Sequence, residues 1–104
     1  MDISVIGDYE SPEYRDLLMK VKILQADETI QDLSRHNSGV WSKDIQGRHE
    51  DIRTANLVVI SRDWDRHLDA KVDIHYAQQE HKECMIEQDG KFIPFTTKSY
   101  SFHK

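Results

Sequence analysis

The sequence predicts one α/β domain: a flavodoxin- or Rossmann-like three-layer sandwich with a short parallel sheet of about four strands and a C-terminal edge hairpin. Apolar runs typical of strands alternate with segments of helical periodicity. The run 56–61 is apolar at nearly every position, as in strands that helices cover on both faces. A chain of 104 residues has room for one core, so we expect a single domain over 1–104.

The strands follow from short apolar runs that end at turn residues. The first run stops at Gly7, the second suits a sheet edge, and the third is expected to be the central strand. Asp89-Gly90 predicts a hairpin between the last two strands, and Pro94 confines the final strand to an edge. The predicted strands are 2–6, 29–33, 56–61, 84–87 and 92–95.

Three further segments carry apolar residues at helical spacing. Ser11 and Pro12 suit the N-cap and first position of the first helix, and Ser42 suits the N-cap of the second. The predicted helices are 12–25, 42–54 and 69–81. The side chains predicted to face the core are Tyr14, Leu17, Leu18, Val21, Leu24, Ile45, His49, Ile52, Ala70, Ile74 and Ala77.

The composition of the chain argues against nucleic acid and a membrane as binding partners. The formal net charge is −5, and Lys and Arg are scattered rather than clustered, so we expect no nucleic-acid partner. The single Cys84 cannot form an internal disulfide, and neither a leader-like apolar segment nor a run of about 20 apolar residues occurs. We therefore expect a cytoplasmic protein without a membrane partner.

Candidate binding residues follow the predicted strands, because ligands of open parallel sheets bind beyond the carboxyl ends of the strands. Gly7 lets a ligand approach the backbone beside Asp8 and Tyr9, although a tight turn with an exposed tyrosine explains the same residues. Arg35 and His36 follow the second strand and could bind a phosphate, as could the arginines after the third strand, Arg62 and Arg66. Surface ion pairs are the alternative for these four.

The loops after the second and third predicted strands also contain the two tryptophans, and the second of these loops contains an acidic stretch. Trp41 and Trp64 are placed to stack on a base or to pack at a subunit interface. Asp63, Asp65 and His67 alternate in one loop, which suits a metal cluster or simply solvated charge. No zinc motif, phosphate-binding loop or dinucleotide glycine pattern is present, so we expect neither a metal nor a cofactor.

Two aspartates of the third predicted helix are the candidates for chemistry. Asp69 and Asp73 are four residues apart, so they share one helix face near the strand ends. A carboxylate held in a pocket can act as a nucleophile or base. Acidic residues also stabilise a helix N-terminus without any further role, so both interpretations stay open.

Three segments resemble the nucleoside 2-deoxyribosyltransferases and related nucleotide N-glycosidases. That family has a first strand ending in Gly-Pro-Tyr or similar, an Ala-Asp-Leu-Val-Val strand, and a helix reading Gly-Thr-x-x-Glu-x-x-x-Ala. The matching stretches here are Gly7-Asp8-Tyr9, Ala55-Asn56-Leu57-Val58-Val59 and Asp69-Ala70-Lys71-Val72-Asp73-Ile74-His75-Tyr76-Ala77. In element order the likeness covers most of the chain.

The resemblance implies a flavodoxin-like fold and cleavage or transfer of an N-glycosidic bond through a carboxylate nucleophile. Asp73 stands at the position of the family's nucleophilic glutamate. His67 stands where the family has a serine that binds the 5′-phosphate, and Asp69 replaces a glycine. The family also implies a homo-oligomer, and an aromatic C-terminal edge supports a dimer or larger assembly. The aromatic residues of that edge are Phe92, Phe95, Tyr100 and Phe102.

Two hypotheses for function follow. The first is an enzyme that cleaves or transfers the N-glycosidic bond of a nucleoside, deoxynucleoside or monophosphate, with Asp73 as nucleophile. The second is a nucleotide-binding or protein-binding domain of the same fold that has lost the chemistry, because the shorter side chain of Asp73 displaces the carboxylate. The candidate binding residues are Gly7, Asp8, Tyr9, Arg35, Trp41, His67 and Asp69.

Overall fold

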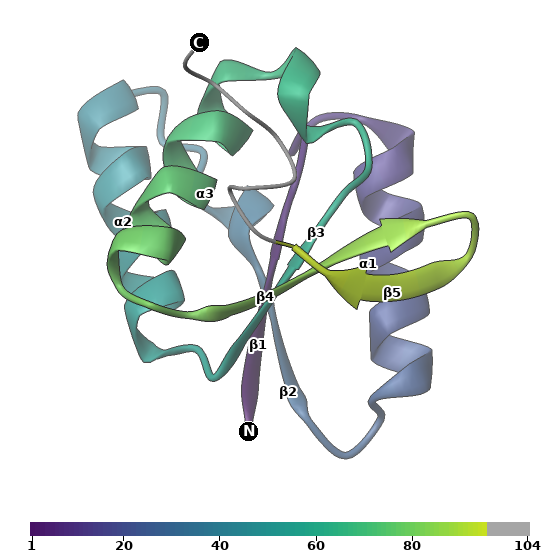
Figure 1. Ribbon diagram of the computed structural model, residues 1–104. Helices are drawn as coiled ribbons and strands as arrows, with labels where there is room; N and C mark the ends of the chain where they lie inside the picture. The colour runs from purple at the N-terminus through teal and green to yellow at the C-terminus, as the bar shows by residue number, and fades with distance from the viewer. Residues whose placement is uncertain (96–104) are drawn as a thin grey trace, which may run out of the picture.

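The computed structural model describes residues 1–95 and has a mixed α/β fold built on one five-stranded sheet (Figure 1). The strand order is β2-β1-β3-β4-β5, in which β1 to β4 run parallel and β5 pairs antiparallel with β4. The elements are β1 (Asp2–Ile6), α1 (Pro12–Leu24), β2 (Thr29–Asp32), the short 3-10 helix η1 (Leu33–Arg35), α2 (Trp41–Thr54), β3 (Leu57–Ile60), the 3-10 helix η2 (Trp64–Arg66), α3 (Leu68–Gln79), β4 (Glu83–Gln88) and β5 (Lys91–Pro94). The expected parallel sheet with a closing edge hairpin is confirmed, with β3 at its centre.

The helices divide between the two faces of the sheet (Figure 1). α1 lies on one face, against β1 and β2, while α2 and α3 pack together on the other. The chain therefore leaves β1 toward one face and leaves its neighbour β3 toward the opposite face. A crevice forms where neighbouring connections diverge in this way.

The core is centred on β1 and β3 and on one tyrosine of α1. Ile3, Ile6 and Ile60 have no exposed surface. Tyr14 is equally buried; its hydroxyl donates to the carbonyl oxygen of Val5 (2.9 Å) and accepts from the N–H of Leu33 (3.1 Å). These two bonds attach α1 to the end of β1 and to the chain that follows β2.

The start of α2 differs from the prediction. Ser42 is not its N-cap: the helix begins at Trp41 after Val40, whose side chain makes no capping bond. Ser38 instead donates from its backbone N–H (2.8 Å) and its hydroxyl (2.7 Å) to Asp44 in the first turn. The Ser38 N–H lowers the pKa of the Asp44 carboxyl, so the helix start is held by an acid reaching back to the preceding loop.

Two apolar side chains also differ from expectation. Trp64 packs into the core at 2% exposure, with its ring edge-on to Phe95 at 5.5 Å between centroids. Neither base stacking nor a subunit contact is its role in this structure. Leu24, predicted to face the core, is 57% exposed because α1 ends there and the chain turns toward β2.

The last strand, β5, and the residue after it contain part of the predicted aromatic edge. The turn at Asp89 and Gly90 has positive φ at both residues, as the Asp-Gly signal predicts. Phe95 is buried, and Phe92 is half-buried with the Lys20 ammonium 5.7 Å from its ring centroid. Tyr100 and Phe102 lie outside the described residues. Within residues 1–95, no helix is long and apolar enough to cross a bilayer.

Candidate functional site

A cleft of about 260 Å³ lies at the carboxyl ends of β1, β2 and β3. We call it the strand-end cleft. Tyr9 and His67 reach it from the connections after β1 and β3, while Trp41 and Arg48 come from α2 and Asp69 from α3. The other lining residues are Glu10, Arg15, Ser34, His36, Asn37 and Asp44.

Behind the cleft lies a buried ionic group, the Asp73 cluster, made of Asp73, Arg48, His49 and Tyr9. Asp73 has no exposed surface. Its Oδ2 accepts from Arg48 Nε and from the Tyr9 hydroxyl, both at 2.6 Å, and its Oδ1 lies 3.0 Å from His49 Nε2. Three donors therefore compensate the carboxylate for the water it has lost.

The cluster changes the proton affinity of its members. Burial raises the pKa of Tyr9 well above its ordinary value, and the neighbouring Asp73 carboxylate raises it further. For Arg48, burial lowers the pKa, but the Asp73 carboxylate outweighs that effect and the net shift is upward. Arg48 therefore stays cationic and Tyr9 stays neutral at physiological pH.

Ring contacts fix the same side chains in place. The Arg48 guanidinium lies 5.0 Å from the Tyr9 ring centroid, close enough for a cation–π contact. The His49 imidazole stacks on Tyr76 with 4.1 Å between centroids and 6° between planes. Each donor to Asp73 is thus held by a second contact, which keeps the cluster in one arrangement.

At the rim of the cleft, Trp41 and Asp69 are joined directly. The indole Nε1 of Trp41 donates to Asp69 Oδ1 at 3.1 Å, and the same oxygen lies 3.8 Å from Arg48 Nη2. Trp41 remains 60% exposed. An exposed ring held by its edge beside a carboxylate and a guanidinium can contact a planar ligand.

Two buried nitrogens of the cleft residues lack hydrogen-bond partners within the described part of the chain. They are Arg48 Nη2 and His67 Nδ1. The other ring nitrogen of His67, Nε2, lies 3.2 Å from Asp8 Oδ1. Because buried polar atoms are normally paired, these two nitrogens indicate that the cleft has capacity for a polar ligand.

A second ionic group, the Asp51 cluster, joins η1 to α2. Arg35 Nη2 lies 2.8 and 2.7 Å from the two Asp51 oxygens, and His36 Nε2 lies 2.7 Å from Oδ2. Gly47 makes this possible, because a Cβ there would overlap the His36 ring. The Asp51 cluster therefore holds the loop after β2 on the helix that carries Arg48.

The predicted binding residues are only partly brought together. Tyr9, Trp41, His67 and Asp69 line the strand-end cleft, and Asp8 reaches it through His67. Arg35 does not line it. Gly7 packs behind it, where a Cβ would come within 2.9 Å of Ser61. We find Asp73, the predicted nucleophile, beneath the cleft with both oxygens bonded; its catalytic role stays a prediction.

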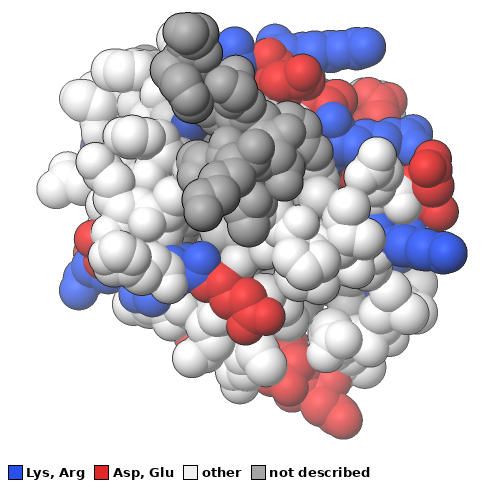
Figure 2. Space-filling model, in the orientation of Figure 1, with Lys and Arg blue, Asp and Glu red and all other residues white. Residues whose placement is uncertain are grey.

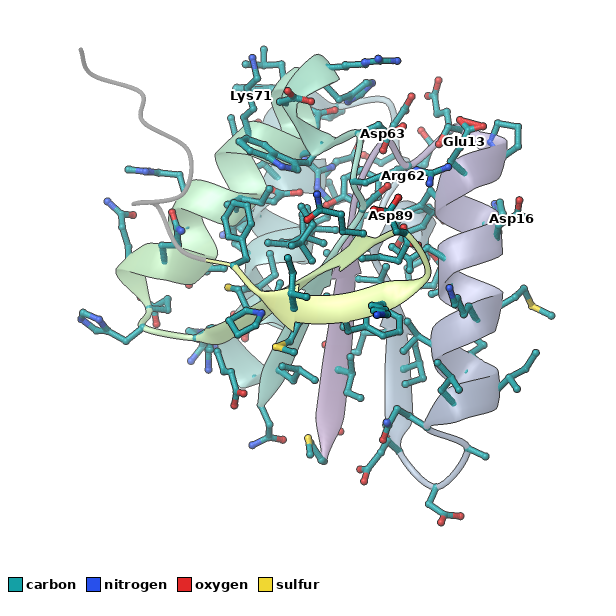
Figure 3. The ribbon with its side chains drawn as sticks, turned by 45° about the vertical axis from the view of Figure 1, so that its right-hand side comes forward. Glu13, Asp16, Arg62, Asp63, Lys71 and Asp89 are labelled. Atoms are coloured by element: carbon teal, nitrogen blue, oxygen red, sulfur yellow. The ribbon has the colours of Figure 1, made fainter. Side chains whose placement is uncertain are left out.

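The two arginines after β3 do not line the strand-end cleft. Arg62 and Arg66 line a separate hollow with acidic residues that include Glu13, Asp63 and Asp89. Figure 3 shows Glu13, Arg62, Asp63 and Asp89 near the N-terminal end of α1. Within residues 1–95, no group of His, Cys, Asp and Glu is arranged to hold a metal ion. On the face visible in Figure 2, Lys and Arg are interspersed with Asp and Glu.

The sequence did not indicate Arg48 as a site residue. It placed His49 on the inner face of the helix without identifying its contact with Asp73. The predicted inner face of this helix consisted of Ile45, His49 and Ile52, so an arginine was not expected on it. Arg48 lies four residues before Ile52 and therefore shares its buried face. An arginine at that spacing, in a chain with an aspartate inside the next helix, is the signal that was available.

Cysteine chemistry is not favoured. Cys84 is buried in β4, and burial raises the pKa of its thiol to about 11. It is therefore protonated at neutral pH and a poor nucleophile.

Comparison of the chain with protein-family models, with curated proteins and with solved structures gave no match.

Proposed function

We propose that this protein is a nucleoside- or nucleotide-binding domain of flavodoxin-like architecture, with its ligand in the strand-end cleft. The observation that carries the proposal is Arg48: a buried guanidinium, paired through Nε with Asp73, whose Nη2 at the cleft has no hydrogen-bond partner among the described residues. A ligand oxygen at that nitrogen would complete its bonding.

The position of the cleft supports this proposal. The connections after β1 and β3 leave for opposite faces of the sheet, and ligands of open α/β sheets bind at such a point. The strand order β2-β1-β3-β4 is that of flavodoxin-like sheets. Residues from the connections after β1, β2 and β3 and from α1, α2 and α3 converge there, as in sites built on rigid scaffolds.

Trp41 supports an aromatic ligand. Its ring is exposed, yet its indole N–H is held by Asp69. Stacking of a base on such a ring contributes about 1–3 kcal/mol. A nucleobase on Trp41 would place its sugar among the polar residues of the cleft.

Binding without turnover is better supported than N-glycosidic cleavage. Attack by Asp73 requires one of its oxygens within about 3–3.5 Å of the anomeric carbon. Both oxygens are occupied by Tyr9, Arg48 and His49, and the residue has no exposed surface. In this arrangement Asp73 is a positioning residue that orients Arg48.

The proposal is tested by a thermal-shift panel of nucleosides and their monophosphates, with chromatography for released base in the same samples. We expect stabilisation by at least one compound without base release, and loss of that stabilisation in Trp41→Ala. Arg66→Gln, outside the cleft, is the matched control. Release of free base would favour the enzyme instead, and no stabilisation by any compound would contradict both.

Self-association also stays a proposal. On the face that carries α1, Leu24, Leu57, Met85 and Phe92 line an apolar hollow of about 180 Å³. A second copy covering this hollow would remove apolar surface from water. Sedimentation of the full chain measures the mass, and Leu24→Glu would lower it if that surface is the contact.

A further inference from the structure

The atoms of the strand-end cleft that have no hydrogen-bond partner among the described residues include both donors and acceptors. Arg48 Nη2 is a donor without a hydrogen-bond partner. His67 Nε2 lies 3.2 Å from Asp8 Oδ1, and in the tautomer with the proton on Nε2 the unpartnered Nδ1 is an acceptor. Asp69 accepts from Trp41 through Oδ1, and within residues 1–95 its Oδ2 makes no hydrogen bond. A ligand that pairs all three atoms therefore supplies donors as well as acceptors.

Hydroxyl groups satisfy this requirement, because each can donate one hydrogen bond and accept others. A sugar hydroxyl can donate to the Asp69 carboxylate while it accepts from Arg48, whose Nη2 lies 3.8 Å from Asp69 Oδ1. A carboxylate that binds a ribose hydroxyl beside a strand end is a known solution in open α/β sheets. The ribose of a nucleoside carries three hydroxyls when its 5′ position is free.

A phosphate does not satisfy the requirement. A phosphate dianion offers acceptors only, so it would leave His67 Nδ1 and Asp69 Oδ2 without donors. The cleft also carries three carboxylates, Glu10, Asp44 and Asp69, against two guanidiniums, Arg15 and Arg48. Arg15 is engaged with Asp32 at 3.7 Å, so the charge balance disfavours a dianion.

We infer that the cleft selects an unphosphorylated ribonucleoside, whose ribose hydroxyls bind Arg48 and Asp69 while its base stacks on Trp41. The inference rests on the proposed function and restricts it to one ligand class. Asp69 is the residue that determines specificity: it accepts from the 2′-hydroxyl and repels a 5′-phosphate. Arg48 is the donor common to every ligand.

Calorimetric titration tests this with the five common ribonucleosides, including inosine, their 2′-deoxy forms and their 5′-monophosphates. We expect the 2′-deoxy form to bind about tenfold more weakly than the parent, since an acceptor left unpaired costs on the order of a factor of ten. The monophosphate should be weaker by a similar factor or more. A monophosphate or deoxynucleoside that binds as tightly as its parent overturns the inference and leaves the proposed function standing.

Asp69→Asn provides the specific variant and Asp27→Asn its matched control, because Asp27 is exposed in the turn before β2, outside the cleft. In Asp69→Asn we expect weaker ribonucleoside binding, no preference over the 2′-deoxy form and stronger relative binding of the monophosphate. Asp27→Asn should change none of these. An unchanged preference in Asp69→Asn overturns the role of Asp69, and binding of no compound by the parent protein overturns the proposed function as well.

Discussion

The Asp73 cluster and the Asp51 cluster contain the same chemistry in different surroundings. In each, an arginine and a histidine from consecutive positions bind one aspartate: Arg48 and His49 on Asp73, Arg35 and His36 on Asp51. Both aspartates are buried, but the Arg48 side chain is 5% exposed whereas the Arg35 side chain is 58% exposed. Burial, not composition, therefore decides which cluster dominates stability and which one can pre-organise a ligand site.

The largest expected difference is in stability. Arg48→Met leaves the Asp73 charge buried without its main partner, which should cost about 3–5 kcal/mol. Arg35→Met removes an exposed guanidinium while His36 stays in contact with the Asp51 carboxylate, so it should cost about 1 kcal/mol or less. Urea unfolding followed by circular dichroism measures both.

A double variant shows whether the loss comes from the unpaired charge. Arg48→Met with Asp73→Leu replaces the buried pair by apolar side chains, and such replacements are often neutral. We expect the double variant to recover most of the stability that Arg48→Met loses. Equal losses for Arg48→Met and Arg35→Met would contradict the distinction between the clusters.

The next largest expected effect on stability concerns the Asp51 cluster and comes from Gly47→Ala. Alanine in place of glycine inside a helix is normally favourable by about 1 kcal/mol. At Gly47 the added Cβ would displace the His36 ring from Asp51, and overpacking of this kind costs about 1–3 kcal/mol. Gly47→Ala should therefore lower the free energy of unfolding, measured in urea.

The sign of this effect should reverse when the histidine is absent. In a His36→Ala background the same Gly47→Ala change meets no ring, so it should raise the free energy of unfolding by about 0.5–1 kcal/mol. Destabilisation in both backgrounds would show that the contact between Gly47 and His36 is not what selects glycine.

These outcomes also show what the sequence could and could not predict. The β-branched runs, the Asp-Gly turn and Pro94 placed every strand, because strand signals are local and apolar. Arg48 was missed because its burial depends on Asp73, 25 residues away, which no local pattern reports. The burial of Trp64 was missed for the same reason, because its partner Phe95 lies beyond three further elements of the chain, α3, β4 and β5.

The candidate site was predicted in outline. Tyr9, Trp41, His67 and Asp69 line one cleft, since parallel strands bring their carboxyl ends to one edge, and their role in binding stays a prediction. Arg35 was assigned by loop position alone, and the ion pair with Asp51 directs it elsewhere. Loop position gives the neighbourhood of a side chain but not its partner.

The smallest expected effect is at alkaline pH, and within the two clusters it concerns Tyr9 of the Asp73 cluster. The folded pKa of Tyr9 lies above its unfolded value, mainly through burial. The stability gained from its neutral form is thus fully present below about pH 10 and is lost as the pH rises further. Absorbance at 295 nm should show Tyr9 and the likewise buried Tyr14 ionising only as the protein unfolds, and Tyr9→Phe should reduce that late component by the share of one tyrosine. Early ionisation of Tyr9 would contradict its burial.

The most direct test of the cleft is nuclear magnetic resonance of the arginine side chains in ¹⁵N-labelled protein, during titration with the ribonucleoside that binds most tightly. If Nη2 of Arg48, which has no hydrogen-bond partner among the described residues, receives the ligand, the Arg48 guanidinium signals shift with occupancy while those of Arg35 stay unchanged. Binding that leaves the Arg48 signals unchanged, or that shifts those of Arg35 instead, would contradict the account.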